Sequence, residues 1–230
     1  MSPRLSRIYS FARSLDLYVL ISLLLVIGGA WVFIEVLEEV NEGDTMRFDR
    51  WAIETIGGYD SPRWLEEIGR DMTALGGIAV LALVSLAVGG YLLLEKKYHA
   101  LLLLIASTLG ALLLSFALKS LIDRDRPDLV LHRSYVMTQS FPSGHSMLSA
   151  AVYLTLGTLL ARLTKHWLLR CYFIGVAIVL TGVVGISRVY LGVHWPTDVL
   201  AGWTAGIVWA ILCWAIARYL QQRGRVEPPT

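Results

Sequence analysis

Six long apolar stretches divide the chain and limit the folds that it can adopt. They run approximately over residues 17–37, 74–94, 99–118, 147–163, 168–186 and 199–217. A helix needs about 20 residues to cross the hydrocarbon core of a bilayer, and most of these stretches reach or approach that length. Only 17% of the residues are charged, whereas a soluble domain carries about 25%. The pattern predicts an all-α integral membrane bundle of six transmembrane helices.

The first apolar stretch resembles a signal peptide in one respect, because Arg4, Arg7 and Arg13 precede it. Its apolar run is longer than the usual ~7–15 residues, and no small-x-small cleavage site ends it cleanly. We therefore expect a retained first helix. Residues 1–230 are then expected to form a single six-helix membrane domain.

Residues 46–69, between the first two apolar stretches, have apolar side chains at helical spacing. The residues at this spacing are Phe48, Trp51, Ala52, Thr55 and Ile56, followed after Pro62 by Trp64, Leu65 and Ile68. Such segments form short amphipathic helices at the surface of a bilayer. We therefore predict an interfacial amphipathic segment, although a plain structured loop explains the pattern equally well.

The distribution of lysine and arginine predicts the orientation of the helices, because cytoplasmic loops are enriched in these residues. With the N-terminus in the cytoplasm, eleven of the 20 basic residues lie on the cytoplasmic side. Of the other nine, five lie between residues 119 and 133 or at Arg188. If those five serve the chemistry of a site, the remaining bias is eleven to four. We expect both termini in the cytoplasm and the site on the extracytoplasmic side of the plasma membrane.

Three polar clusters lie at the ends of predicted membrane helices, and the topology places all three on one side. They are Lys119 with Arg126-Pro127, then Pro142-Ser143-Gly144-His145, then Ser187-Arg188 with His194 and Asp198. Charged groups near membrane depth are costly and usually mark a functional site. The clusters contribute three cations, two imidazoles and one carboxylate. This composition suits the binding of a tetrahedral oxyanion.

The three cations have complementary roles in binding phosphate. Arg126 and Arg188 carry planar guanidinium groups that bind phosphate oxygens through paired hydrogen bonds, and Lys119 contributes a compact positive charge. The start of the fourth apolar helix adds further donors. The N–H groups of residues 143–145 would open that helix, and an unsatisfied helix N-terminus binds anions. Gly144 lets the backbone approach the ligand closely, and the hydroxyl group of the preceding serine adds another donor.

The two histidines of the clusters have different expected roles. Asp198 follows His194 by four residues and can accept a hydrogen bond from one ring nitrogen, which exposes the other nitrogen as a nucleophile. His145, beside the same phosphate, is placed to protonate the departing oxygen. General acid catalysis contributes roughly 10²–10⁴-fold. The cations must therefore supply much of the remaining rate enhancement by stabilising charge on the phosphoryl oxygens.

Neither nucleic acid nor a metal is expected as a partner. The net charge of +2 is small, and no basic tract interleaved with aromatic residues is present. Asp123, Asp125 and Asp128 form an array that could indicate a divalent cation, but Arg124 and Arg126 between them would repel it. We therefore expect no metal and no cofactor.

Taken together, the three clusters resemble the signature of the type 2 phosphatidic acid phosphatase superfamily, which includes the lipid phosphate phosphatases and, more distantly, vanadium-dependent haloperoxidases. All three parts are present in order over residues 119–198. The resemblance implies a phosphate-binding set of Lys119, Arg126, Ser143, Gly144, His145 and Arg188. It also implies that His194 is the nucleophile, that Asp198 is its partner and that His145 is the general acid.

The resemblance further implies a metal-independent enzyme that removes phosphate from membrane lipid phosphates or pyrophosphates through a phosphohistidine intermediate. Substrates in the family include undecaprenyl pyrophosphate, phosphatidylglycerol phosphate and phosphatidic acid. Two other functions stay open: a phosphatase or phosphotransferase for soluble phosphate esters, and a non-enzymatic membrane anion transporter. A transporter needs neither a His–Asp pair nor a second histidine, which disfavours it. The preferred lipid headgroup and the oligomeric state cannot be read from the sequence.

Overall fold

The computed structural model describes residues 17–56, 61–127 and 139–222. These residues form eight α-helices and no strand. The helices are α2 (Leu17–Glu42), α3 (Met46–Ile56), α4 (Arg63–Ala74), α5 (Ile78–Leu94), α6 (Tyr98–Leu121), α7 (Gly144–Arg162), α8 (Trp167–Tyr190) and α9 (Pro196–Gln222).

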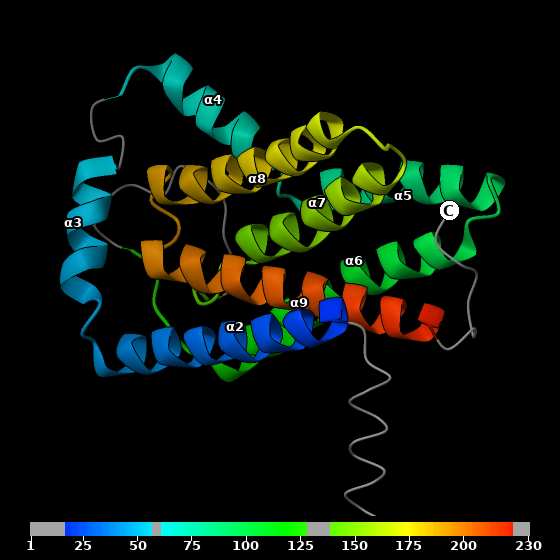
Figure 1. Ribbon diagram of the computed structural model, residues 1–230. Helices are drawn as coiled ribbons and strands as arrows, with labels where there is room; N and C mark the ends of the chain where they lie inside the picture. Colours follow the sequence, from blue (N-terminus) through cyan, green and yellow to red (C-terminus); the bar gives the residue numbers. More distant parts are fainter. Residues whose placement is uncertain (1–16, 57–60, 128–138, 223–230) are drawn as a thin grey trace, which may run out of the picture.

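Most of the long helices lie lengthwise beside one another, and α3 crosses one end of the bundle (left in Figure 1). The helix α7 lies at the centre, because it contacts α5, α6, α8 and α9. Its buried side chains include Met147, Ala150, Ala151 and Val152. Small residues allow α9 to approach it closely: a Cβ atom on Gly202 would lie 2.6 Å from the carbonyl oxygen of Ser143.

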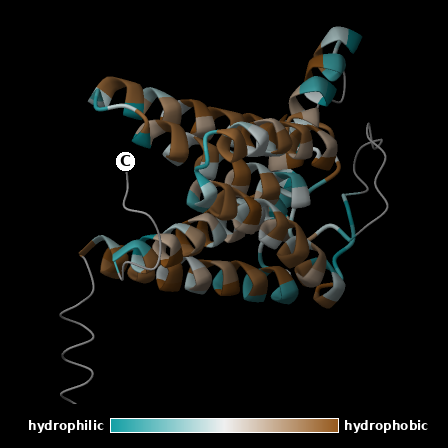
Figure 2. Ribbon diagram, turned by 90° about the vertical axis from the view of Figure 1, so that its right-hand side faces the viewer, coloured by the Kyte–Doolittle hydropathy of each residue, from teal (hydrophilic) through white to brown (hydrophobic). Residues whose placement is uncertain are grey.

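The apolar surface of the bundle faces outward, as expected of a membrane protein. Five helices are long and apolar enough to cross a membrane: α2, α6, α7, α8 and α9. The pair α4 and α5 forms a sixth candidate span that bends by 47° at its break. Leu24, Leu86 and Leu113 are 69%, 74% and 69% exposed, and Figure 2 shows hydrophobic residues along most of the long helices. The predicted all-α membrane bundle is confirmed, with five spans or six if the bent pair is counted.

The amphipathic segment predicted over residues 46–69 contains two short helices, α3 and the first part of α4. On α3, Ala52 is buried, Phe48, Trp51 and Ile56 are exposed, and Asp49 lies on the buried face. The aromatic side of α3 therefore points away from the bundle, and its protein-facing side carries a carboxylate.

Candidate active site

Four helix ends bring the three sequence clusters together at one end of the bundle. Lys119 lies in the last turn of α6, and Arg188 lies in the last turn of α8. His145 lies in the first turn of α7, Asp198 lies in the first turn of α9, and His194 lies between α8 and α9. Because consecutive helices run in opposite directions, these ends meet. The cations and both histidines are close enough to interact electrostatically.

The His194 and Asp198 side chains are buried and form a pair. Nδ1 of His194 lies 3.3 Å from Oδ2 of Asp198. The same carboxylate oxygen accepts hydrogen bonds from the Trp195 N–H at 2.9 Å and the Ser140 hydroxyl at 2.5 Å. The Arg126 guanidinium lies 3.4 Å from the other ring nitrogen, Nε2. Because arginine can only donate, this contact assigns the proton to Nδ1 and the lone pair to Nε2.

Burial keeps the His194 imidazole neutral. It lowers the pKa of His194 to about 3, and the positive charges of Arg188 and Arg126 act in the same direction, whereas Asp198 raises it. The pKa of Arg126 is also lowered, chiefly by burial. A neutral imidazole with its lone pair on the side of the cations is the form required of a nitrogen nucleophile.

Two cations of the site are held by backbone carbonyl groups. The ammonium group of Lys119 donates to the carbonyl oxygen of Gln139 at 2.6 Å, and the Arg126 guanidinium donates to the same oxygen at 3.3 Å. Arg126 also donates to the carbonyl oxygen of Val193 at 2.5 Å. The shared carbonyl oxygen of Gln139 thus brings the Lys119 and Arg126 side chains together.

Arg188 is a buried cation with an unused donor. Its side chain is 2% exposed, and one guanidinium nitrogen donates to the hydroxyl group of Thr73 at 2.9 Å. Its Nε has no hydrogen-bond partner among the described residues. A buried, unsatisfied charged donor is costly unless a ligand satisfies it. Thr73 belongs to α4, so the bent α4–α5 pair helps to orient this arginine, a contact that the sequence did not reveal.

The first turn of α7 provides fewer donors than the sequence predicted. The Ser143 N–H donates to the carbonyl oxygen of Asp198 at 2.9 Å, so it is not available to a ligand. The Ser143 hydroxyl caps the helix by accepting from the Ser146 N–H at 3.5 Å and the Ser146 hydroxyl at 3.0 Å. The hydroxyl hydrogen of Ser143 and the N–H groups of Gly144 and His145 make no such bond within the described residues. The expectation of three available N–H groups was therefore wrong for Ser143.

His145 is half-buried, and its imidazole makes no hydrogen bond within the described residues. Its backbone packs against Gly76, in the break between α4 and α5, where an added Cβ atom would lie 3.2 Å from the His145 carbonyl oxygen. The ring is therefore available to a ligand, while the surrounding backbone fixes the position of the residue.

A buried ionic network lies behind Asp198, and the sequence did not predict it. Arg124 donates to Oδ1 of Asp198 at 2.5 Å, to the hydroxyl group of Thr197 at 2.8 Å and to Oδ2 of Asp49 at 2.7 Å. Asp49 in turn accepts from the Thr197 N–H at 3.1 Å and the Thr197 hydroxyl at 2.7 Å. The network joins α3 to the start of α9. One signal was available: Asp49 lies three and four residues before the buried Ala52 and Ile53, on the same helix face.

The structure also bears on the aspartate array that could have indicated a metal. Asp123 and Asp125 are exposed, and Asp128 lies outside the described residues. Within the described part of the chain, no group of three His, Cys, Asp or Glu side chains could hold a metal ion.

Comparisons with known proteins identify the family of the chain. The family model of the PAP2 superfamily matches residues 100–222. Phosphatidylglycerophosphatase B of Bacillus subtilis is 40% identical over 152 residues, which cover 63% of this chain and 71% of that protein. Lipid A 1-phosphatase of Rhizobium etli is 30% identical over 174 residues, which cover 66% of this chain and 71% of that protein.

Among solved structures, the transmembrane PAP2-type phosphatidylglycerolphosphate phosphatase from Bacillus subtilis superposes with a TM-score of 0.76 at 28% identity. The superposition covers 84% of this chain and 96% of the other. Family match, sequence identity and fold agree, and they show that the chain belongs to the PAP2 superfamily.

Proposed function

We propose that this protein is a metal-independent phosphatase that removes phosphate from membrane lipid phosphates or pyrophosphates. The observation that carries the proposal is the buried His194–Asp198 pair, because its Nε2 carries a lone pair on the side of the cations. The phosphatidylglycerophosphatase and lipid A 1-phosphatase relatives are both named as phosphatases of phosphorylated lipids. The candidate spans favour a substrate that lies in a bilayer.

In this proposal, three cations bind the phosphate. Lys119 and Arg126 bind its oxygens from one side, and the unsatisfied Nε of Arg188 donates from the buried side. The N–H groups of Gly144 and His145 add the donors of a helix N-terminus. This set spreads positive charge around the phosphoryl oxygens, where negative charge concentrates in the transition state.

The reaction proceeds in two displacements. Nε2 of His194 attacks phosphorus, so that an N–P bond forms while the P–O bond to the lipid breaks. The departing oxygen keeps the electron pair of that bond and takes a proton from His145. Water then attacks the phosphohistidine and returns a proton to His145, and the N–P electron pair returns to Nε2 as orthophosphate leaves. With a pyrophosphate substrate, the first leaving group is the lipid monophosphate.

The site is proposed to lie at the bilayer surface, on the extracytoplasmic side. The lysine and arginine bias of eleven to four supports this orientation. The exposed Phe48, Trp51 and Trp64 on α3 and α4 supply apolar and aromatic surface at the same end of the bundle. Such residues favour the membrane–water interface. We further propose that residues 1–230 act as a single membrane domain, with the 46–69 segment at the point of lipid entry.

Phosphate release from purified protein in detergent tests the proposal. The panel consists of phosphatidylglycerol phosphate, undecaprenyl pyrophosphate, phosphatidic acid and a soluble ester such as glycerol phosphate. We expect turnover of at least one lipid, its loss in His194→Ala, and no effect of EDTA. Turnover of glycerol phosphate alone would favour the soluble-ester phosphatase. Loss of activity in EDTA with recovery in magnesium would exclude the metal-independent mechanism.

A further inference from the structure

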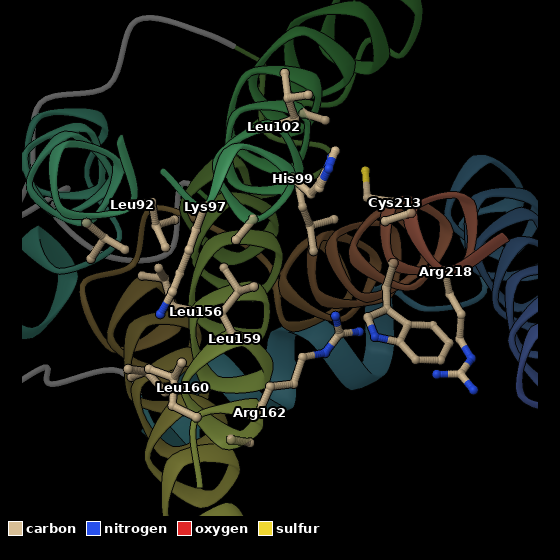
Figure 3. Close-up of a pocket in the computed structure, with 18 of the residues that line it drawn as sticks. Leu92, Lys97, His99, Leu102, Leu156, Leu159, Leu160, Arg162, Cys213 and Arg218 are labelled. Carbon is tan, nitrogen blue, oxygen red and sulfur yellow. The ribbon is translucent and has the colours of Figure 1, made fainter. Parts of the chain in front are cut away.

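A large cavity lies at the end of the bundle opposite His194. Its volume is about 1120 Å³, and residues of α5, α6, α7 and α9 form most of its wall. Leu102, Leu156 and Leu159 belong to its apolar lining (Figure 3). His145 and Arg162 lie near opposite ends of α7, which separates the cavity from the phosphate site by roughly 25 Å at 1.5 Å per residue.

The cavity has a cationic rim. The basic residues that line it are Lys97, His99, Arg162, Arg170 and Arg218. None of the described lining residues is an aspartate or a glutamate. The guanidinium groups of Arg162 and Arg218 both lie 5.7 Å from the ring of Trp214. Two like charges are thus held around one aromatic ring, where an anion between them would relieve their repulsion.

Simple snorkelling does not account for this arrangement. Cations at a membrane boundary usually extend toward headgroups and water. Arg162 and Lys97 are instead half-buried and line the apolar cavity, and Figure 3 shows both among its leucines. Arg170 donates to the carbonyl oxygen of Thr164 at 2.9 Å, which holds it beside the rim. Basic pockets between membrane helices of this kind bind anionic lipid headgroups.

We propose that the cavity binds an anionic phospholipid from the leaflet at that end of the bundle. Its phosphate binds between Arg162 and Arg218, with Arg170 beside the rim, and its acyl chains lie along the leucines of the cavity. The chemical match has two parts, because a cationic rim without acids selects a negative headgroup, and a long apolar wall selects a lipid over a free anion. This site is separate from the phosphate site and does not depend on the proposed reaction.

Thermal unfolding of the purified full chain tests the proposal. Dioleoyl phosphatidylglycerol, added in a zwitterionic detergent, should raise the Tm in a concentration-dependent way, whereas dioleoyl phosphatidylcholine should not. Equal effects of the two lipids would overturn the role of the cationic rim. In the Lys119→Gln variant, whose phosphate site is weakened, equal stabilisation by glycerol phosphate or inorganic phosphate would overturn the role of the acyl chains.

Variants locate the binding. Arg162→Gln combined with Arg170→Gln should weaken the apparent affinity for phosphatidylglycerol about tenfold or more, because a charge-assisted hydrogen bond contributes at least that factor. Lys96→Gln combined with Lys165→Gln removes the same charge at the same end from exposed residues that do not line the cavity. Equal weakening in both double variants would show a diffuse surface effect and contradict the proposal.

A variant at the opposite end separates this proposal from the phosphatase function. Lys119→Gln should bind phosphatidylglycerol like the parent, whatever its effect on phosphate release. If Lys119→Gln abolished the stabilisation, the lipid would be occupying the phosphate site, and the cavity proposal would fail even if the enzyme proposal stood.

Discussion

His194 and His145 are expected to respond differently to the leaving group of the substrate. His194→Ala removes the attacking nitrogen, so no substrate should restore the rate. His145→Ala removes only the proton donor, and a lipid alcohol needs that proton to leave. This variant should lose much of the roughly 10²–10⁴-fold contribution of general acid catalysis on a lipid phosphate. It should lose far less on nitrophenyl phosphate, whose phenolate departs as an anion.

The measurement is the ratio of kcat/KM for variant and parent on each substrate. The His145 imidazole also belongs to the expected phosphate-binding set, so the rescue on nitrophenyl phosphate should be partial. Equal losses on both substrates for His145→Ala would contradict its role as the acid. Rescue of His194→Ala by the better leaving group would contradict its role as the nucleophile.

Arg124 is expected to act as a positioning residue through Asp198. It donates both to this carboxylate and to Asp49, and all three side chains are buried. Asp49→Asn should weaken the hold on one side of the Arg124 guanidinium group. Arg124 would then fix the Asp198 carboxylate less firmly, and this carboxylate would orient the His194 imidazole less well. We expect kcat to fall about tenfold or more with little change in KM, because the phosphate-binding cations are untouched. We also expect a loss of stability of about 3–5 kcal/mol, typical of breaking a buried ion pair.

Glu54→Gln provides the matched control, because Glu54 is an exposed acid on the same helix. It should leave kcat, KM and the Tm unchanged. If Asp49→Asn lowered only the Tm, or raised KM as much as it lowered kcat, the network would be structural and would have no positioning role.

The buried, neutral His194 should make stability depend on pH. Its pKa is lowered to about 3 in the folded protein, whereas an unfolded histidine titrates near 6.5. Between these values the unfolded state binds more protons, so stability rises with pH up to about 6.5 and is lost progressively below it. In detergent, the Tm of the parent should fall more steeply between about pH 6.5 and 4.5 than that of His194→Gln. His166→Gln, at an exposed histidine, should retain the slope of the parent.

The motif residues of the site could be predicted from the sequence because they are close together in the chain and chemically distinctive. Asp49 and Thr73 could not be predicted in this way. Each comes from a short helix far from the motifs, and each is an ordinary polar residue until the fold brings it against Arg124 or Arg188. The sequence could also not predict that the Ser143 N–H is already hydrogen-bonded, because the carbonyl group that accepts from it belongs to α9.

At the scale of the helices, apolar length predicted the spans because a bilayer requires about 20 apolar residues. It did not predict which face of α3 is buried. In a soluble protein the apolar face of a helix packs inward, whereas next to a bilayer the apolar face can point outward into lipid. Phe48 and Trp51 therefore face away from the bundle, and the polar Asp49 faces the protein. The break after α4 was hidden because residues 74–94 read as one continuous apolar run.

This break is expected to be essential for the site, and Gly76 makes it possible. An added Cβ atom there would clash with Cγ1 of Val184 and lie 3.2 Å from the His145 carbonyl oxygen. Gly76→Ala should therefore push the start of α7 away from the α4–α5 pair and move His145 relative to the phosphate. We expect a stability loss of about 1–3 kcal/mol, typical of overpacking, together with a loss of phosphate release.

The control for this prediction is Gly90→Ala in α5, where an added Cβ atom would meet nothing within 4 Å. It should keep the activity of the parent and gain up to about 1 kcal/mol of stability from better helix propensity. Tm and phosphate release are measured for both variants. Parental activity in Gly76→Ala would show that the break does not position His145.

At the scale of the whole molecule, the alternating direction of the helices places all site residues at one end of the bundle. The orientation of the bundle in the membrane therefore decides on which side of the membrane the site lies. Exposed Gln139 marks the site end, and exposed Lys165 marks the other. In a background with Cys171 and Cys213, both free thiols, replaced by serine, a membrane-impermeant thiol reagent should label Gln139→Cys in intact cells. It should label Lys165→Cys only after the cells are lysed. This result is expected because the eleven-to-four bias of lysine and arginine predicts that the Lys165 end lies in the cytoplasm. The reverse labelling would place the phosphate site in the cytoplasm, so that the enzyme would draw its substrates from the inner leaflet.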